Sequence, residues 1–219
     1  MSRKLISAII CGVLAFSLVS CGNKKERINE SNPNVKVDER VFEGTWAKDY
    51  TKDEVTSFHN DIIANVEELT KIYDLDYQMK EVVVEDKGVP VKVSEIYLDN
   101  LNAESNRLES MHYNFKIYGE DSSEGQITLT IGFNLDKALV LEEGEFNFET
   151  TSMGSYSEAF TGIDNRDYTD LNNSIYAIIS GESTGKKIEN NLDGIIETVN
   201  ITDDYLLYKL ETKKYTFKN

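Results

Sequence analysis

The side chains best suited to acid–base or metal chemistry are the only two histidines, His59 and His112. A histidine acts as a general base or a metal ligand only where a nucleophile, a carboxylate or further ligands converge on it. His59 follows Phe58 in a helix-like pattern, and His112 precedes Tyr113 in a strand-like one. The sequence indicates no strand–turn–helix nucleophile elbow and no metal-binding spacing around them. We therefore interpret both as ordinary surface or boundary residues and predict a protein that is not an enzyme and uses no cofactor.

A glycine-bounded run, Gly181-Glu182-Ser183-Thr184-Gly185-Lys186, has some of the features of a phosphate-binding loop. That motif needs four residues between its glycines and a Ser or Thr after its lysine. Here three residues separate the glycines, and Lys187 follows Lys186. The run predicts an exposed loop between two helices rather than a nucleotide site.

Oxygen-bearing side chains are dense between Asp164 and Asp170, as in calcium-binding loops. The spacing does not fit an EF-hand, because Arg166 occupies a ligand position. An Asp-rich helix start just before Leu171 explains the same residues. We favour the helix start, predict no metal site, and keep calcium as the lesser alternative.

The N-terminal segment combines two cations near its start with an uncharged, mostly apolar run over residues 5–19. This arrangement is typical of a secretory signal peptide, and the run is marginal in length for a membrane-spanning helix. It ends in Leu18-Val19-Ser20-Cys21, which resembles the lipobox of bacterial lipoproteins. The resemblance implies cleavage after Ser20 and a diacylglyceryl group on the Cys21 thiol. An uncleaved N-terminal anchor is the alternative.

Loss of residues 1–20 would leave no free thiol, because Cys11 departs with the signal peptide and Cys21 is acylated. The mature chain is therefore expected to form no disulfide and no Cys-ligated zinc site. The formal charge of −16 would become −18, since Arg3 and Lys4 are removed. So acidic a surface repels phosphate backbones, and we predict no nucleic-acid partner.

Composition divides the rest of the chain in two. Residues 21–40 are polar, rich in Asn and interrupted by Pro33, which predicts a flexible membrane tether. Residues 41–219 form a segment of about 180 residues, long enough for one extracytoplasmic domain with a full core. This layout resembles the small surface lipoproteins of clostridia and related Gram-positive bacteria, whose roles are mostly unassigned. The resemblance implies a cell-surface location on the outer face of the cytoplasmic membrane, anchored there by the lipid.

Hydrophobic periodicity within residues 41–219 predicts an α+β fold. A capping box of Thr51 and Glu54 precedes apolar residues at helical spacing as far as Tyr73. The alternating segments that follow indicate an antiparallel sheet of about six strands, with helices packed on one face. The strand candidates are residues 79–85, 89–98, 113–117, 127–133, 138–141, 146–148, 205–210 and 215–217, and two further helices are predicted around residues 171–179 and 188–199.

The function that we predict is non-enzymatic binding of an amphipathic small molecule, such as a lipid, a bile-salt-like detergent or a hydrophobic peptide. Twelve tyrosines, each with an apolar ring and a polar tip, suit such a ligand. We expect it between the first helix and the apolar face of the sheet. The alternative is a protein–protein adaptor of an envelope, biofilm, sporulation or sensor complex. The predicted ligand-binding residues are Phe58, Ile62, Phe115, Phe146 and Phe148.

Overall fold

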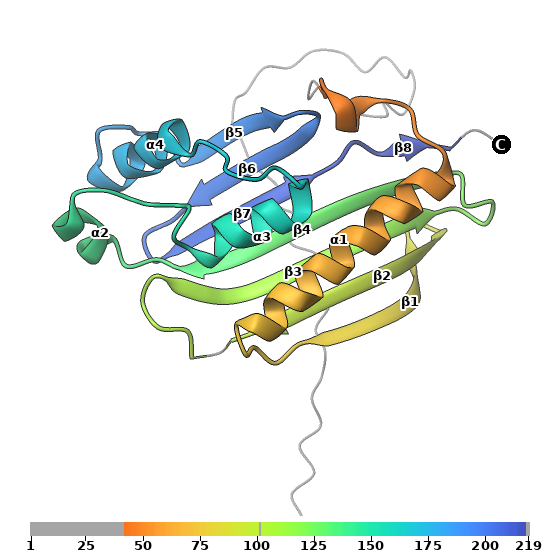
Figure 1. Cartoon of the computed structure of the whole chain (residues 1–219), viewed down its shortest axis with the longest axis horizontal. Helices are drawn as coiled ribbons and strands as arrows, with labels where there is room; N and C mark the ends of the chain where they lie inside the picture. Colours follow the sequence, from red (N-terminus) through yellow and green to blue (C-terminus); the bar gives the residue numbers. More distant parts are fainter. Residues whose placement is uncertain (1–41, 101, 218–219) are drawn as a thin grey trace, which may run out of the picture. The chain divides into compact units, whose positions relative to one another are not determined.

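The computed structural model describes residues 42–100 and 102–217, and these residues form one compact unit (Figure 1). The predictions for Ser20, for Cys21 and for the tether at residues 21–40 lie outside the described residues. None of the helices in the described part is both long and apolar enough to span a membrane.

An eight-stranded sheet with only antiparallel pairings forms the centre of the fold. The strand order is β1-β2-β3-β4-β7-β6-β5, and β8 pairs with β4. The α+β class and the antiparallel sheet are as predicted, with eight strands in place of about six. The strands are β1 (Gln78–Asp86), β2 (Val89–Asp99), β3 (Arg107–Tyr118), β4 (Glu124–Asn134), β5 (Lys187–Leu192), β6 (Ile195–Ile201), β7 (Tyr205–Glu211) and β8 (Tyr215–Thr216).

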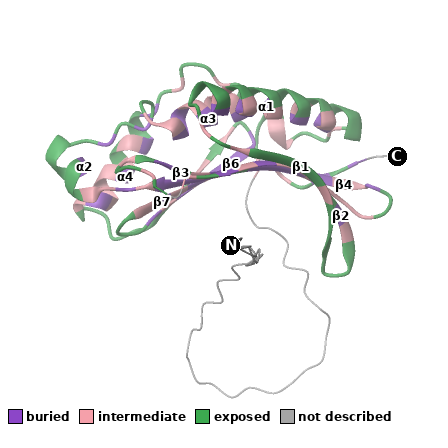
Figure 2. Ribbon diagram, turned by 90° about the horizontal axis from the view of Figure 1, so that it is seen from below, coloured by how far each residue is buried: buried purple, intermediate pink, exposed green. Residues whose placement is uncertain are grey.

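The helices lie on one side of this sheet (Figure 2). Helix α1 packs on β3 and β4, α3 packs on β3 and β7, and α4 packs on β6. Between them and the sheet lies the core, and four core residues of β4 are no more than 1% exposed: Ile127, Leu129, Ile131 and Phe133. The helical segments are the short 3-10 helix η1 (Thr45–Ala47), α1 (Lys52–Ile72), α2 (Lys137–Glu143), α3 (Ser152–Thr161) and α4 (Thr169–Ser180).

Helix α1 begins at the predicted capping box. The Thr51 hydroxyl accepts a hydrogen bond from the Glu54 backbone N–H, and the Glu54 carboxylate accepts one from the Thr51 N–H. Because these bonds satisfy N–H groups that the helix itself leaves free, they fix where the helix starts. Val55, Ile62 and Val66 then face the sheet and are buried.

The predicted helix at residues 188–199 is wrong, because this segment forms the hairpin of β5 and β6. Asp193 and Gly194 both have positive φ, 52° and 99°, as a two-residue hairpin turn requires. The turn also contacts η1: Asp193 O accepts from Trp46 N at 2.9 Å, and Asp193 Oδ1 accepts from Thr45 N at 2.8 Å. An Asp-Gly pair between apolar runs therefore outweighed an apparent helical spacing.

Two short strand predictions are also wrong. Residues 138–141 belong to helix α2, whose first turn is capped by the Asp136 carboxylate, which accepts from Leu139 N at 3.1 Å. Residues 146–148 lie in the irregular segment before α3, a helix that the apolar spacing did not predict. The loop at residues 181–186 is exposed, as predicted. It leads to a strand rather than to a second helix.

A buried ion pair joins the α3–α4 connection to the sheet. Glu197 on β6 is 0% exposed, and the Arg166 guanidinium donates to both of its carboxylate oxygens, at 2.6 and 2.8 Å. Tyr208 Oη and Asn190 Nδ2 each donate to the same carboxylate at 2.8 Å. Burial alone would lower the pKa of Arg166, but the bonds to Glu197 outweigh it and raise the pKa. Arg166, the residue that does not fit the calcium-loop pattern, thus has a structural role. Its guanidinium also lies over the Tyr168 ring, with Cζ 4.6 Å from the ring centroid.

We expect Arg166→Met to lower the free energy of unfolding by about 3 to 5 kcal/mol, since it leaves Glu197 buried without its cation. Urea unfolding of the two proteins measures the difference. Lys187→Met is the control, because it breaks an exposed pair with Glu189 and should cost no more than about 1 kcal/mol. Equal losses in the two variants would contradict the role assigned to Arg166.

Candidate functional site

A groove of about 450 Å³ lies between the N-terminal half of α1 and strands β1, β2 and β3. Its size is within the range of small-molecule sites in proteins. It runs along the part of the sheet that α1 leaves open, close to the edge strand β1. Its lining comprises Thr56, His59 and Asn60 from α1, Glu81, Val82 and Val83 from β1, Lys92, Val93 and Ser94 from β2, and Phe115 and Ile117 from β3.

The groove lining is mixed in character. The valines, Phe115 and Ile117 supply apolar surface, while α1 and the middle of β2 supply hydroxyl, amide and imidazole groups. Lys92 and Glu81 add one charge of each sign, and neither has an ion-pair partner within the described residues. A surface of this kind suits a molecule with an apolar body and a polar end.

His59 is the buried polar residue of the groove, and its interpretation as a surface or boundary residue is wrong. Its side chain is 7% exposed, its Nδ1 lies 2.8 Å from Tyr113 Oη, and its ring packs on Phe115 with centroids 4.7 Å apart. Burial lowers the pKa of His59 to about 4, so the ring is neutral at pH 7. Its Nε2 has no hydrogen-bond partner among the described residues, which leaves this nitrogen for a ligand.

The helical spacing of the sequence contains the signal for this burial. His59 follows Val55 by four residues and precedes Ile62 and Val66 by three and seven, so all four share one face of α1. That face packs against the sheet. The position alone therefore predicts a buried imidazole.

His112 lies on the other face of the sheet and is a surface residue, as predicted. Its side chain is 47% exposed, and Nε2 lies 2.9 Å from Glu95 Oε2. Lys80 pairs with the same carboxylate at 3.0 Å. Although burial raises the pKa of Glu95, the bonds from Lys80 and His112 outweigh it and lower the pKa. The fold thus keeps the two histidines apart and forms no site from them.

The five predicted ligand-binding residues do not converge. Phe115 lines the groove, whereas Phe58 packs on Trp46 and Tyr50 with centroids 5.2 and 4.9 Å away. Ile62 is 5% exposed beneath α1. The remaining two are core residues away from the groove: Phe146 contacts Phe133, and Phe148 contacts Tyr168 and Tyr208.

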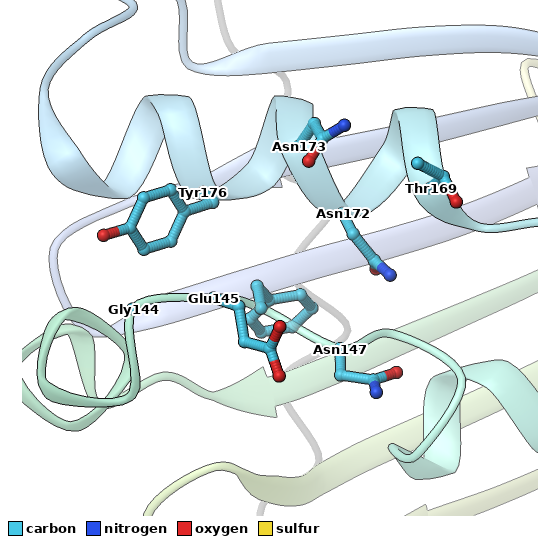
Figure 3. A pocket seen from close by; sticks show the side chains of 8 residues that line it. Gly144, Glu145, Asn147, Thr169, Asn172, Asn173 and Tyr176 are labelled. Atoms are coloured by element: carbon cyan, nitrogen blue, oxygen red, sulfur yellow. The ribbon is translucent and has the colours of Figure 1, made fainter.

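A smaller hollow of about 250 Å³ lies between α4 and the segment after α2 (Figure 3). A hydrogen bond from Phe148 N to Asn172 Oδ1, at 2.8 Å, holds the Asn172 side chain there. Most of the lining is polar, which makes the hollow less suited to an amphipathic ligand than the groove. It consists of Gly144, Glu145, Phe146, Asn147, Thr169, Asn172, Asn173 and Tyr176.

A third cleft, of about 540 Å³, lies between the segment after α1, the β2–β3 connection and the start of α3. The β2–β3 connection includes residue 101, which is outside the described part of the chain. Asn and Thr side chains make up much of its wall, together with Arg107 and Glu104. Its apolar surface is broken up by these polar groups, so the groove beside α1 is the better candidate.

The remaining motifs are structural. Residues 181–185 match G-x-S-x-G in residue type, but they follow a helix and precede a strand, the reverse of a nucleophile elbow. Ser183 Oγ accepts a hydrogen bond from Gly185 N at 3.3 Å. Helix α4 begins at Thr169, which confirms the predicted helix start before Leu171. Asp167 Oδ1 accepts a hydrogen bond from Thr169 N at 2.9 Å. Among the described residues, no three His, Cys, Asp or Glu side chains are grouped so as to hold a metal ion.

Comparison with known proteins gives no assignment: no family model, no curated protein and no solved structure matches this chain. The fold and the groove therefore define the molecule as an α+β protein with an open amphipathic groove beside its first helix.

We expect His59→Gln to reduce the acid sensitivity of the fold. The folded-state pKa of about 4 lies below the ordinary value of 6.5, so the unfolded chain takes up the proton first as the pH falls. This destabilises the wild type below pH 6.5, by about 2 kcal/mol at pH 5, and has almost no effect at pH 7. Gln can hydrogen-bond to Tyr113 and does not titrate.

The measurement is urea unfolding at both pH values, and His112→Gln is the control because this histidine is exposed. The wild type and the His112→Gln variant should lose more stability between pH 7 and pH 5 than His59→Gln does. The same loss in all three proteins would show that His59 is not buried as a neutral ring.

Proposed function

We propose that this chain is a membrane-anchored, extracytoplasmic binding protein that holds an amphipathic small molecule in the groove beside α1. The observation that carries the proposal is the lining of the groove, which joins apolar surface from three strands to hydrogen-bonding groups from α1 and β2. The proposed activity is binding without chemical conversion of the ligand.

The apolar part of the ligand would lie along Val83, Phe115 and Ile117, where it replaces water. Each methylene group buried there contributes about 0.8 kcal/mol, or about a fourfold gain in affinity. The polar end would reach either the free Nε2 of His59 or the charge of Lys92. Affinity should therefore rise with chain length until the groove is full.

The proposed location rests on the lipobox resemblance at residues 18–21. A diacylglyceryl group supplies two acyl chains, which give stable membrane attachment where a single chain gives only marginal attachment. The adaptor alternative is favoured by a different observation, the exposed valines of edge strand β1, because open strand edges recruit other chains.

We expect Thr56→Trp to abolish ligand binding, because the indole ring would occupy the groove. Ser57→Trp is the matched control, since Ser57 is the next residue of α1, is exposed and does not line the groove. The measurement is a thermal-shift titration with fatty acids of increasing chain length and with deoxycholate, all below micelle-forming concentrations. A ligand at about 100 times its dissociation constant should stabilise the wild type by about 2.7 kcal/mol, or roughly 5 to 10 °C.

The Ser57→Trp variant should show the same shift as the wild type, and Thr56→Trp should show none while keeping its own folded stability. Equal shifts in both variants would place the ligand elsewhere. No shift with any of these amphiphiles in the wild type would sink the proposed ligand class.

We expect Cys21→Ala to release the protein from the membrane fraction and to prevent incorporation of labelled palmitate. Cys11→Ala is the control, because Cys11 lies within the predicted signal peptide and is not the predicted lipid acceptor. Fractionation of cells expressing each variant measures both effects. Palmitate labelling that survives in Cys21→Ala would refute the lipid anchor.

A further inference from the structure

Strand β1 is an open edge of the sheet. It pairs with β2 on one side, and no other described strand pairs with it. Eight of its nine residues are exposed, including Val83 at 68% and Val84 at 46%. The pairing with β2 runs without a register shift, and β1 contains no proline. Natural edge strands are protected against pairing with another chain by shortening, bulges, proline or charged side chains. Of these features β1 has only the charges, at Lys80, Glu81, Glu85 and Asp86, so a pairing partner must match them.

The hairpin turn determines which backbone groups of β1 face outward. Lys87 and Gly88 have φ values of 51° and 81° and connect Asp86 to its partner Val89. In a two-residue hairpin the closing pair is hydrogen-bonded, and hydrogen-bonded pairs then alternate along the strands. The N–H and C=O groups of Met79, Glu81, Val83 and Glu85 therefore point to the open edge. These groups are the donors and acceptors that a further strand would need in order to pair with β1.

We propose that a second copy of this chain pairs antiparallel with β1, with the two-fold axis passing through Val82. In this register Glu81 lies opposite Val83 of the partner subunit, and Lys80 lies opposite Val84 of the partner subunit. No like charges lie directly opposite each other, and Lys80 is diagonal to Asp86 of the partner subunit. Opposite charges on neighbouring strands stabilise a sheet pair, and like charges directly opposite destabilise it.

The two neighbouring symmetric registers are less favourable. An axis through Glu81 would place that residue directly opposite Glu81 of the partner subunit. An axis through Val83 would place Glu81 opposite Glu85 of the partner subunit. On a chain with a formal charge of −16, an added carboxylate pair at the contact opposes association. Among these three registers, the charge pattern of β1 favours the axis at Val82.

This pairing would also change the groove. Residues directly opposite in an antiparallel pair point to the same face, so the α1 helices of both copies would lie on one side of the joined sheet. Val83 lines the groove at its β1 side, where the described chain leaves it open. The two grooves would then lie side by side over a continuous floor of β2, β1 and their counterparts. The pairing itself rests on the edge strand and not on the proposed ligand.

Substitution at Val83 tests the pairing and its register together. Val83→Lys places a cation opposite Glu81 of the partner subunit at both symmetry-related contacts and should tighten the dimer by roughly two- to thirtyfold. Val83→Glu places a carboxylate there and should weaken it by a similar factor. Val83 is exposed and lies opposite Lys92 of its own β2. Val83→Lys therefore adds a like-charge pair within the monomer and Val83→Glu an opposite-charge pair, so the β1–β2 hairpin itself favours the Glu variant, the reverse of the order expected for the dimer. The measurement is sedimentation equilibrium of the full chain, without ligand, over a wide range of concentrations, because a contact of this size is expected to be weak.

Disulfide trapping gives a second, independent readout in the full chain carrying Cys11→Ala and Cys21→Ala. In the proposed register the two Val82 positions are opposite and within disulfide reach, whereas the two Val83 positions are diagonal and beyond it. Val82→Cys should therefore form a crosslinked dimer, and Val83→Cys should form much less.

A wild type that stays monomeric at every concentration would overturn the pairing. Weakening by both Val83→Lys and Val83→Glu, or preferential crosslinking at Val83, would overturn the register. Because these measurements contain no amphiphile, their failure would leave the ligand proposal standing, and a flat ligand screen would leave the pairing standing.

Discussion

The sheet is wider than the layer of helices that covers it, and the rest of this structure depends on that mismatch. Helices α1, α3 and α4 all lie on one side of the sheet and pack on its middle strands, β3, β4, β6 and β7. The central strand β4 is accordingly buried along its helix-facing residues. The β1–β2 hairpin extends beyond this cover (Figure 1). The groove is thus a consequence of this incomplete layer, and it lies beside the edge strand β1, which pairs only with β2 among the described strands.

Buried polar contacts hold the helices in the positions that leave this part uncovered. The bond between His59 and Tyr113 fixes α1 against β3, and Thr70 Oγ1, 2.8 Å from Tyr156 Oη, fixes the other end of α1 against α3. Toward the β5 end of the sheet, the Arg166–Glu197 pair holds the segment before α4 against β6. Such contacts are directional, so a shifted helix would leave buried polar atoms without partners. They specify the width of the groove more sharply than apolar packing alone could.

The sequence predicted the elements whose signals are local. The capping box at Thr51 and the turn at residues 86–88 fixed α1 and the first hairpin before any packing was known. The β5–β6 hairpin was misread because Ile195 and Ile196 are adjacent and both buried, at 0% and 4% exposed, so the strand does not alternate. The turn at Asp193-Gly194 was the better signal.

The candidate site was less predictable than the fold, because it depends on where α1 lies on the sheet. Phe115 was predicted from alternation alone, and the burial of His59 follows from its spacing to Val55 and Ile62. Lys92 and Ser94 gave no such signal, since they look like ordinary solvent-facing strand residues until the helix is placed beside them. Phe146 and Phe148 were assigned to the sheet face, and they belong instead to the core near α4.

The two proposals have a thermodynamic link, because the groove and the edge share strand β1. A ligand that contacts both copies across the edge would bind the dimer more tightly than the monomer by some factor. By reciprocity, saturation with that ligand must strengthen the dimer by the same factor per site. A ligand confined to one groove, between α1 and Phe115, would have no such effect. The size of this coupling therefore reports whether the ligand stays within one groove or reaches across β1, a distinction that depends on how far the apolar body extends from His59.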